Sequence, residues 1–223
     1  MLFVGAGSVA RDDMNAQSGQ SNLGSLEAGA GRRIGLLGGS FNPAHEGHLH
    51  ISQLAIKLLE LKEIWWLISP QNPLKSEEGM APLADRLAGA ESLAGGEKIT
   101  VTALESELGT RYTADTLNAL KERFPEAQFV WLMGADNLIQ IDRWHNWTSI
   151  FETVPVAIFA RPTYSLEAES AKASTQFARF RVKPHQANQL ADMDSPAWVF
   201  LRTPESSVSA TEIRTRQAGN GAK

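Results

Sequence analysis

Short apolar runs alternate with longer amphipathic segments along the chain from residue 33 onward. Such runs, bounded by polar or glycine-rich segments, predict buried β-strands. The six predicted strands are Ile34–Leu37, Ile64–Ile68, Ile99–Thr102, Phe129–Met133, Val156–Ala160 and Ala197–Leu201. Four tryptophans lie on or beside these strands and are expected in the core: Trp65, Trp66, Trp131 and Trp198.

The segments between the strands predict helices. They are His48–Lys62, Leu83–Leu93, Thr113–Phe124, Asp136–Asp142, Trp147–Val154, part of 165–180, and Ser209–Gln217. Strands that alternate with helices imply right-handed βαβ crossovers and a parallel sheet. The expected fold class is therefore α/β: a Rossmann-like, doubly wound parallel sheet with helices on both faces, in a single domain.

Composition divides the chain into three parts. Residues 1–31 are rich in Gly, Ser, Ala, Asn and Gln, with little apolar periodicity. They cannot bury enough surface to offset the entropy of ordering, so they are predicted to be a disordered N-terminal leader. Residues 32–217 are predicted to form the folded domain, and residues 218–223 a disordered tail.

The overall composition excludes several classes of protein. The 223 residues, 43% of them hydrophobic, suffice for one sizeable α/β domain. A formal net charge of −4 argues against a general nucleic-acid binder, which needs a basic surface. The absence of cysteine excludes disulfides and thiol catalysis. No apolar run approaches the length of a membrane span, and the first residues lack the basic start of a signal peptide, so we expect a cytoplasmic protein.

Histidines gather in one short stretch of the sequence. Three of the five fall within six residues, in the run Gly38-Gly39-Ser40-Phe41-Asn42-Pro43-Ala44-His45-Glu46-Gly47-His48-Leu49-His50. The run joins a predicted strand to a predicted helix, so its imidazoles lie where a helix presents unpaired N–H groups. Such a position attracts anions, and histidine donors beside it indicate phosphate chemistry.

Other interpretations of this run are weaker. His45 and His48 are three residues apart, whereas a zincin helix needs four, and no cysteine completes a zinc set, although carboxylates could serve. Gly38-Gly39 lacks the G-x-G-x-x-G spacing, and no Walker A lysine follows. A purely structural role, with glycines for a tight turn and histidines satisfied locally, stays open. His50 lies beyond the motif and is interpreted as structural.

The run resembles the signature of the nucleotidyltransferase superfamily that carries a T/HxGH motif. Near the C-terminus, Val208-Ser209-Ala210-Thr211-Glu212-Ile213-Arg214 resembles its partner motif, I-S-x-T-x-I-R. Three further segments resemble the bacterial nicotinate-nucleotide adenylyltransferases: Tyr112–Leu117, Met133–Asn137 and Arg143-Trp144. The resemblance covers roughly residues 33 to 216.

This resemblance implies a reaction and a place for it. The expected activity is adenylyl transfer from ATP to nicotinate mononucleotide, giving nicotinate adenine dinucleotide and pyrophosphate in NAD biosynthesis. The attack is direct and in line, without a covalent intermediate, because the nucleophile is an already ionised phosphate oxygen. The family's strand order, 3-2-1-4-5, reverses between strands one and four and so places the site in the crevice there.

By the same resemblance, the phosphate site has two groups of residues. The expected catalytic residues are His45, His48 and Arg214, with His48 nearest the α-phosphate. The expected ATP-binding residues are Gly38, Gly39, Ser40, Phe41, Ser209, Thr211 and Arg161. The two glycines would let the backbone approach the nucleotide, Ser40 and Phe41 would line its pocket, and Ser209 and Thr211 would hold the β- and γ-phosphates. Mg²⁺ is expected with ATP, without a dedicated protein metal site.

The resemblance also implies a nicotinate mononucleotide pocket. Its expected residues are Thr113, Asp136, Trp144, His145 and Lys75. Trp144 would stack on the nicotinate ring, and the backbone around Thr113 and His145 would hold its carboxylate. For Trp144 the alternative is that it packs a helix onto the sheet together with Trp147. Asp136 would bind a ribose hydroxyl or cap the following helix, and Lys75 would reach the mononucleotide phosphate or lie in solvent.

Two other functions compete with this one. The same superfamily includes enzymes with a different acceptor, such as phosphopantetheine, although those relatives usually lack a segment like that of Trp144. A catalytically silent nucleotide sensor is the other alternative, but His48 and Arg214 are both present. The expected partners are the small-molecule substrates, with no nucleic acid and no membrane. The oligomeric state stays open, a homo-oligomer included.

Overall fold

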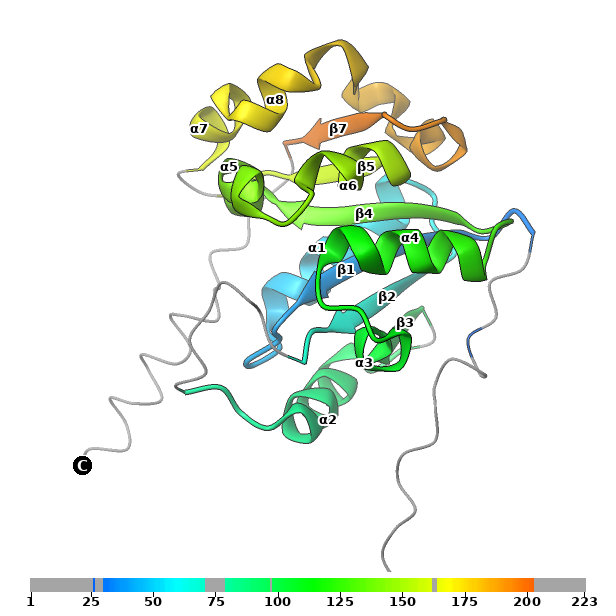
Figure 1. Cartoon of the computed structure of the whole chain (residues 1–223), viewed down its shortest axis with the longest axis vertical. Helices are drawn as coiled ribbons and strands as arrows, with labels where there is room; N and C mark the ends of the chain where they lie inside the picture. Colours follow the sequence, from blue (N-terminus) through cyan, green and yellow to red (C-terminus); the bar gives the residue numbers. More distant parts are fainter. Residues whose placement is uncertain (1–25, 27–29, 71–78, 97, 162–163, 203–223) are drawn as a thin grey trace, which may run out of the picture.

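A computed structural model describes residues 26, 30–70, 79–96, 98–161 and 164–202 (Figure 1). Its strands form one sheet in the order β3-β2-β1-β4-β5-β7-β6, in which every pairing is parallel. The strands are β1 (Arg33–Gly39), β2 (Glu63–Ile68), β3 (Ile99–Thr102), β4 (Gln128–Gly134), β5 (Val156–Phe159), β6 (Arg181–Val182) and β7 (Trp198–Leu201). The predicted order 3-2-1-4-5 is confirmed and extended by two strands.

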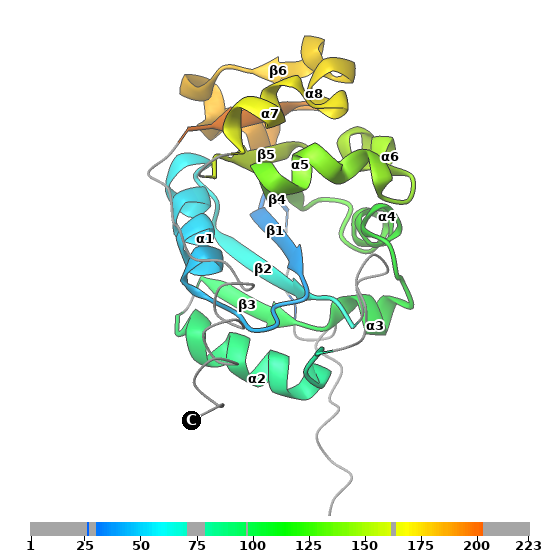
Figure 2. The same ribbon diagram turned by 90° about the vertical axis from the view of Figure 1, so that its left-hand side faces the viewer.

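Helices cover both faces of this sheet. They are α1 (Glu46–Leu58), α2 (Leu83–Ala94), α3 (Leu104–Leu108), α4 (Thr113–Arg123), α5 (Ala135–Gln140), α6 (Trp147–Thr153), α7 (Ser165–Ser170) and α8 (Lys172–Gln176), with the 3₁₀ segments η2 (Ile141–Arg143), η3 (Ala178–Phe180) and η4 (Pro184–Asp192). One core cluster joins the sheet to α4, α5, α6 and α8, and the other joins it to α1, α2 and η4. Figure 2 shows α1 and α4 on opposite sides of the sheet. The α/β doubly wound prediction is confirmed.

The central strands are buried on both faces, which is why they read as apolar runs in the sequence. In β2, Trp65 belongs to the cluster beneath α4 and Trp66 to the cluster beneath α1, because successive side chains on a strand point to opposite faces. The four tryptophans predicted in the core are at most 3% exposed. That prediction is confirmed.

Several element boundaries differ from the prediction. Helix α1 ends at Leu58 rather than Lys62, and the helix predicted over Asp136–Asp142 is divided into α5 and η2. Strand β6 and helix α3 were not predicted, because both are short and neither forms a long apolar run. The helix predicted at Ser209–Gln217, the tail and most of the leader lie outside the described residues.

Two residues of the predicted leader are tied to the domain. Leu26 packs against the core cluster beneath α4, and the Gly31 N–H donates to the Glu126 carbonyl at 3.2 Å.

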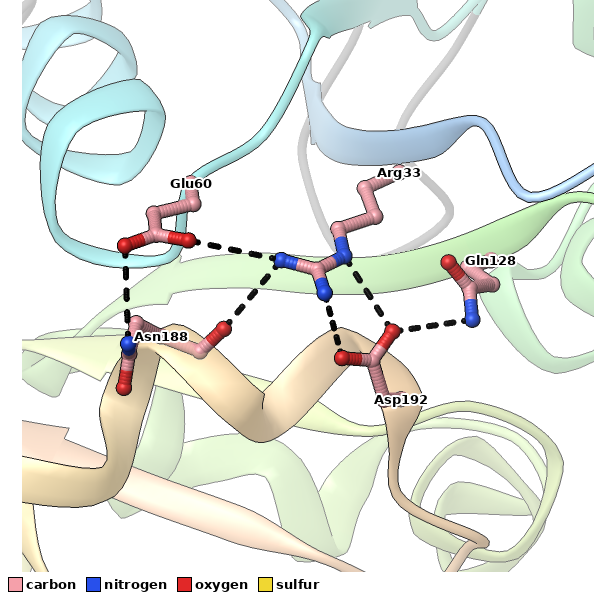
Figure 3. Close-up of polar contacts among 5 residues, drawn as sticks. All are labelled: Arg33, Glu60, Gln128, Asn188 and Asp192. Atoms are coloured by element: carbon pink, nitrogen blue, oxygen red, sulfur yellow. Dashed lines mark hydrogen bonds and ion pairs between the residues drawn. The ribbon is translucent and has the colours of Figure 1, made fainter.

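A polar network fixes the amino end of β1 (Figure 3). Arg33 makes a bidentate pair with Asp192 through its Nε and Nη2 atoms, with Nε to Oδ1 at 3.1 Å. Its Nη1 donates to the Asn188 carbonyl at 3.4 Å and lies 3.7 Å from Glu60 Oε2. Gln128, at the start of β4, donates to Asp192 at 3.0 Å. The network ties two central strands to η4, and it lies at the end of β1 opposite to the glycine turn.

Candidate active site

The segments that follow β1, β4 and β5 lie at the carboxyl edge of the sheet. Strand β1 pairs with β2 on one side and with β4 on the other, so the strand order reverses at β1 and β4. Open parallel sheets bind ligands at this reversal, beyond the carboxyl ends of the strands. The loop after β1 carries the histidine run, β4 leads directly into α5 without a loop, and Arg161 follows β5 closely.

His45 and His48 cap the start of α1 reciprocally. His45 is the N-cap residue with an extended backbone, and its Nδ1 accepts the Gly47 N–H at 3.1 Å. The Nδ1 of His48 accepts the His45 N–H at 3.2 Å. Since an acceptor nitrogen carries no proton, the neutral form of each ring has its proton on Nε2. Each ring therefore caps the helix with one nitrogen and has an N–H donor at the other.

His45 is neutral at physiological pH. The residue is 6% exposed, and burial together with the nearby charge of Arg161 lowers the pKa of its imidazole to about 4. The rings of His45 and His48 lie with their centroids 3.9 Å apart. A buried neutral imidazole of this kind supplies a hydrogen-bond donor rather than a positive charge.

Three residues hold His48 in place. Phe41 stacks on its imidazole with a centroid distance of 4.4 Å, and Phe41 lies 5.2 Å from the Trp66 ring. Ser52 Oγ donates to the His48 carbonyl at 2.8 Å and accepts from Trp66 Nε1 at 2.8 Å. Phe41 itself is 1% exposed, so its ring packs against the imidazole from the protein interior. It offers the predicted nucleotide pocket almost no surface.

The glycines of the site make room for protein side chains. A Cβ on Gly38 would lie 2.4 Å from Cη2 of Trp131, and one on Gly39 would lie 3.3 Å from the Phe41 ring. A Cβ on Gly134 would lie 2.4 Å from Oδ1 of Asp136. Packing against the Trp131 ring is thus sufficient to favour glycine at 38, whereas at 134 the Asp136 and Arg161 side chains would have to shift.

An ion pair joins the first turn of α5 to the segment after β5. Arg161 Nε lies 3.2 Å from Asp136 Oδ1, and both side chains are about a quarter exposed, at 25% and 29%. The N-cap of α5 is Gly134, and Asp136 is the second residue of that helix. The alternative in which Asp136 caps the helix is therefore wrong. The pair places a guanidinium close enough to His45 to act on its pKa.

The residues predicted to bind the nicotinate ring come from α4 and from the turn before α6. Thr113 is the first residue of α4, after Tyr112 at its N-cap. The exposed His145 lies against the Tyr112 ring, with a centroid distance of 4.4 Å. Trp144 directly follows η2, is partly buried against the core, and does not share a helix with Trp147, which begins α6. A shared-helix role for these two tryptophans is thus wrong, although both pack against the core.

Comparison with known proteins places the chain in a family. The Cytidylyltransferase-like family model matches residues 36–216. A protein of Parvibaculum lavamentivorans named "Probable nicotinate-nucleotide adenylyltransferase" is 52% identical over 186 residues, which are 83% of this chain and 92% of that one. The chain belongs to the nicotinate-nucleotide adenylyltransferase family of enzymes. A protein with the same name from Methylorubrum extorquens strain PA1 is 50% identical over 184 residues, which are 82% of this chain and 100% of that one.

A solved structure supports the fold of this family member. The Plasmodium falciparum nicotinic acid mononucleotide adenylyltransferase complexed with NaAD matches with a TM-score of 0.63 and 21% identity. The match covers 82% of this chain and 83% of that chain. At this identity the likeness shows the shared α/β fold.

Four predicted site residues lie outside the described part of the chain: Lys75, Ser209, Thr211 and Arg214. Sequence reasoning also missed two residues that organise the site, Arg86 and Asn42. Arg86 had a detectable signal, since it lies between Leu83 and Ala90 on the face of α2 that packs on the sheet. A charged residue at such a position needs buried partners.

Among the residues that the structure describes, no group of three or more His, Cys, Asp or Glu side chains is placed to hold a metal ion. None of the helices that these residues form is long and apolar enough to cross a membrane.

Proposed function

We propose that this family member transfers the adenylyl group of ATP to nicotinate mononucleotide, releasing pyrophosphate and nicotinate adenine dinucleotide. The observation that carries the proposal is the reciprocal cap of His45 and His48 at the start of α1. It gives two adjacent imidazoles defined N–H donors beside a helix N-terminus, in a chain of this family.

The proposed step forms one bond and breaks one. A phosphate oxygen of the mononucleotide attacks the α-phosphorus, and the bond from that phosphorus to the bridging oxygen breaks. The pyrophosphate leaves with the electron pair. The nucleophile is already an anion at neutral pH, so no side chain has to remove a proton. The enzyme has to align the two substrates and stabilise the negative charge that builds on the transferred and leaving groups.

His45 and His48 fit this requirement. Both rings would donate from Nε2 to phosphate oxygens, and their capping bonds prevent them from rotating away. Because His45 is neutral, a full positive charge has to come from elsewhere. Arg161 is a suitable source near His45, and by family resemblance Arg214 is another. We propose that Mg²⁺ arrives as part of the ATP substrate, bound to its phosphates.

The acceptor would bind between α4 and the turn before α6. We propose that Trp144 stacks on the pyridine ring, while backbone groups at Thr113 and His145 hold the carboxylate. Asp136 would bind a ribose hydroxyl, although its pairing with Arg161 means that one oxygen is already engaged. Lys75 remains a proposed contact of the mononucleotide phosphate.

The experiment is pyrophosphate release from ATP, with nicotinate mononucleotide, nicotinamide mononucleotide and phosphopantetheine supplied separately. The proposal expects the fastest release with nicotinate mononucleotide. Faster release with another acceptor would retain the phosphate site and reject the proposed acceptor pocket. No release with any of the three, despite measurable ATP binding, would favour the nucleotide sensor.

A further inference from the structure

We propose that Arg86 is a positioning residue that sets the geometry of the phosphate site by holding the loop after β1 against both ends of the loop between β2 and α2. It touches neither proposed substrate and would act through His48. This inference rests on the proposed function for its kinetic consequences. The contacts that carry it are independent of that function.

The Arg86 guanidinium binds four backbone carbonyls from three segments. Nη1 donates to Ser40 in the loop after β1 and to Ser69 after β2, each at 2.7 Å. Nη2 donates to Pro70 at 2.8 Å, and Nε donates to Ala81, just before α2, at 3.0 Å. Only a planar fork of fixed N–H groups can meet carbonyls in so many directions at once.

The charge of Arg86 is buried and its partners are neutral. The residue is 4% exposed, and burial lowers the pKa of the guanidinium. Among the described residues, no carboxylate lies within ion-pair distance of it. The four carbonyls therefore compensate the desolvation of this charge, and removing the fork would leave several of them without a partner. A surface ion pair would not impose such a constraint.

Both supports of His48 begin on segments that Arg86 holds. On one side, Ser40 is followed by Phe41, whose backbone is left-handed with φ of 45° and whose ring stacks on His48. On the other side, β2 ends directly before Ser69 and carries Trp66, which holds the His48 carbonyl through Ser52. A shift of the Ser40 carbonyl would move Phe41 and with it the imidazole.

Asn42 adds a second link to the same segment. Its Nδ2 donates to the Gly79 carbonyl at 2.9 Å, and its Oδ1 accepts the Ala81 N–H at 3.2 Å. Helix α2 has no side-chain cap, so its entry is fixed by these contacts with Asn42 and Arg86. The histidine loop and the start of α2 consequently behave as one unit at the carboxyl edge of the sheet.

The experiment compares four variants of the full chain. Arg86→Lys keeps the positive charge but cannot reach four carbonyls, and Arg86→Met removes the donors. Arg33→Lys and Arg33→Met are controls, because the Arg33 guanidinium also joins several segments, although mainly through the carboxylates of Asp192 and Glu60, and lies at the other end of β1 (Figure 3). For each variant we would measure kcat, KM for ATP, Tm, and hydrogen exchange of the Ser69 and Ala81 amides, which bond Gly39 and Asn42.

The proposal expects Arg86→Lys to lose about 10- to 100-fold in kcat, because small displacements at a phosphate site are costly. The Ser69 and Ala81 amides should exchange faster. The Arg33 variants should lose Tm but keep the wild-type kcat and the wild-type exchange at these two amides. An Arg86→Lys enzyme with unchanged kcat and exchange overturns the proposal, as does an equal loss of kcat in an Arg33 variant of the same Tm. If Arg86→Met does not fold, Arg86→Lys alone tests the proposal.

Failure of the proposed function is distinguishable from failure of this inference. If the proposed function fails, the wild-type protein releases no pyrophosphate with nicotinate mononucleotide. The kcat values of the variants are then measured with whichever acceptor works. Without any working acceptor, amide exchange and calorimetric ATP binding decide for Arg86. Faster exchange with weaker ATP binding in Arg86→Lys supports the inference, and unchanged values overturn it.

Discussion

The Nδ1 atom of His48 accepts the backbone N–H of His45 at 3.2 Å, and this bond links helix capping to the proposed chemistry. The same ring that satisfies the start of α1 is fixed as an Nε2–H donor. A structural role and a phosphate role for these histidines are thus complementary. Substitutions can separate the atom that caps the helix from the atom that would contact phosphate.

Replacing His48 with Asn or Ala should separate the two roles. Asn keeps an acceptor for the His45 N–H but has no group at the position of Nε2, whereas Ala removes both. We expect both variants to lose about 10²- to 10³-fold in kcat, the usual cost of one lost transition-state donor. Only His48→Ala should also lose about 1 kcal/mol of stability, the usual value of a cap. Pyrophosphate release and thermal unfolding measure the two effects, with His50→Ala as the control on the same helix. Recovery of the rate in His48→Asn would contradict the donor role.

The ionisation of His45 gives a prediction about acid pH. Its pKa of about 4 lies below the ordinary value of 6.5, so the unfolded chain takes up a proton first as pH falls. The stability due to neutral His45 is complete above pH 6.5 and is lost as pH falls through about 4. NMR titration of labelled histidine should show one ring that stays neutral at pH 5. Arg161→Ala should raise this pKa, because the Arg161 charge is one of its causes. A His45 that titrates near 6.5 would contradict the buried, neutral state.

The sequence predicts the fold and the position of His45 and His48 at a helix start, because both rest on local patterns. Buried parallel strands read as apolar runs, and helix starts have characteristic residues. The functions of Arg86 and Phe41 depend on contacts between segments distant in the chain, such as the bond from Arg86 to Ser40 across 46 residues. No periodic pattern of residues in the sequence indicates these contacts. For the same reason, the prediction considered a ribose contact and a helix cap for Asp136 and missed its pairing with Arg161.

Buried Glu105 predicts a loss of stability as pH rises from 4.5 to about 7. Burial raises the pKa of its carboxyl to about 7, although a 3.4 Å hydrogen bond from Thr116 opposes the shift. The protonated form is favoured in the folded state, so this stability is present below pH 4.5 and is lost as pH rises through about 7. We expect Glu105→Gln to be more stable than the wild type at pH 8, by about 1–3 kcal/mol, and similar to it near pH 4.5.

The control for this prediction is Glu107→Gln, which changes an exposed carboxylate on the same helix. Thermal unfolding between pH 4.5 and 8 should give parallel curves for Glu107→Gln and the wild type. Glu105→Gln alone should flatten the decline in stability between pH 4.5 and about 7. If its curve stays parallel to that of the wild type, Glu105 does not titrate in this range.

Two glycines should respond to alanine in opposite directions. At Gly38 the new Cβ would meet the Trp131 ring at 2.4 Å, so Gly38→Ala should destabilise the fold by about 1–3 kcal/mol. At Gly89, inside the exposed part of α2, nothing lies within 4 Å, so Gly89→Ala should stabilise by up to about 1 kcal/mol. Chemical denaturation measures both. A neutral Gly38→Ala would mean that Trp131 moves aside freely.

Alanine substitutions at Trp144 and Trp147 should distinguish a role in substrate binding from a role in packing. Trp147 makes edge contacts with Phe151 and Phe177, at centroid distances of 6.3 Å and 5.9 Å, so Trp147→Ala should lower Tm and leave substrate affinities unchanged. Trp144→Ala removes the proposed stacking surface for the pyridine ring. We expect it to raise KM for nicotinate mononucleotide by about 3- to 10-fold, which corresponds to the usual value of an aromatic stack, while KM for ATP stays constant. Initial rates measured over a grid of both substrate concentrations separate the two constants. Equal increases in both constants would show that Trp144 supports the whole site through packing, and would remove it from the acceptor pocket.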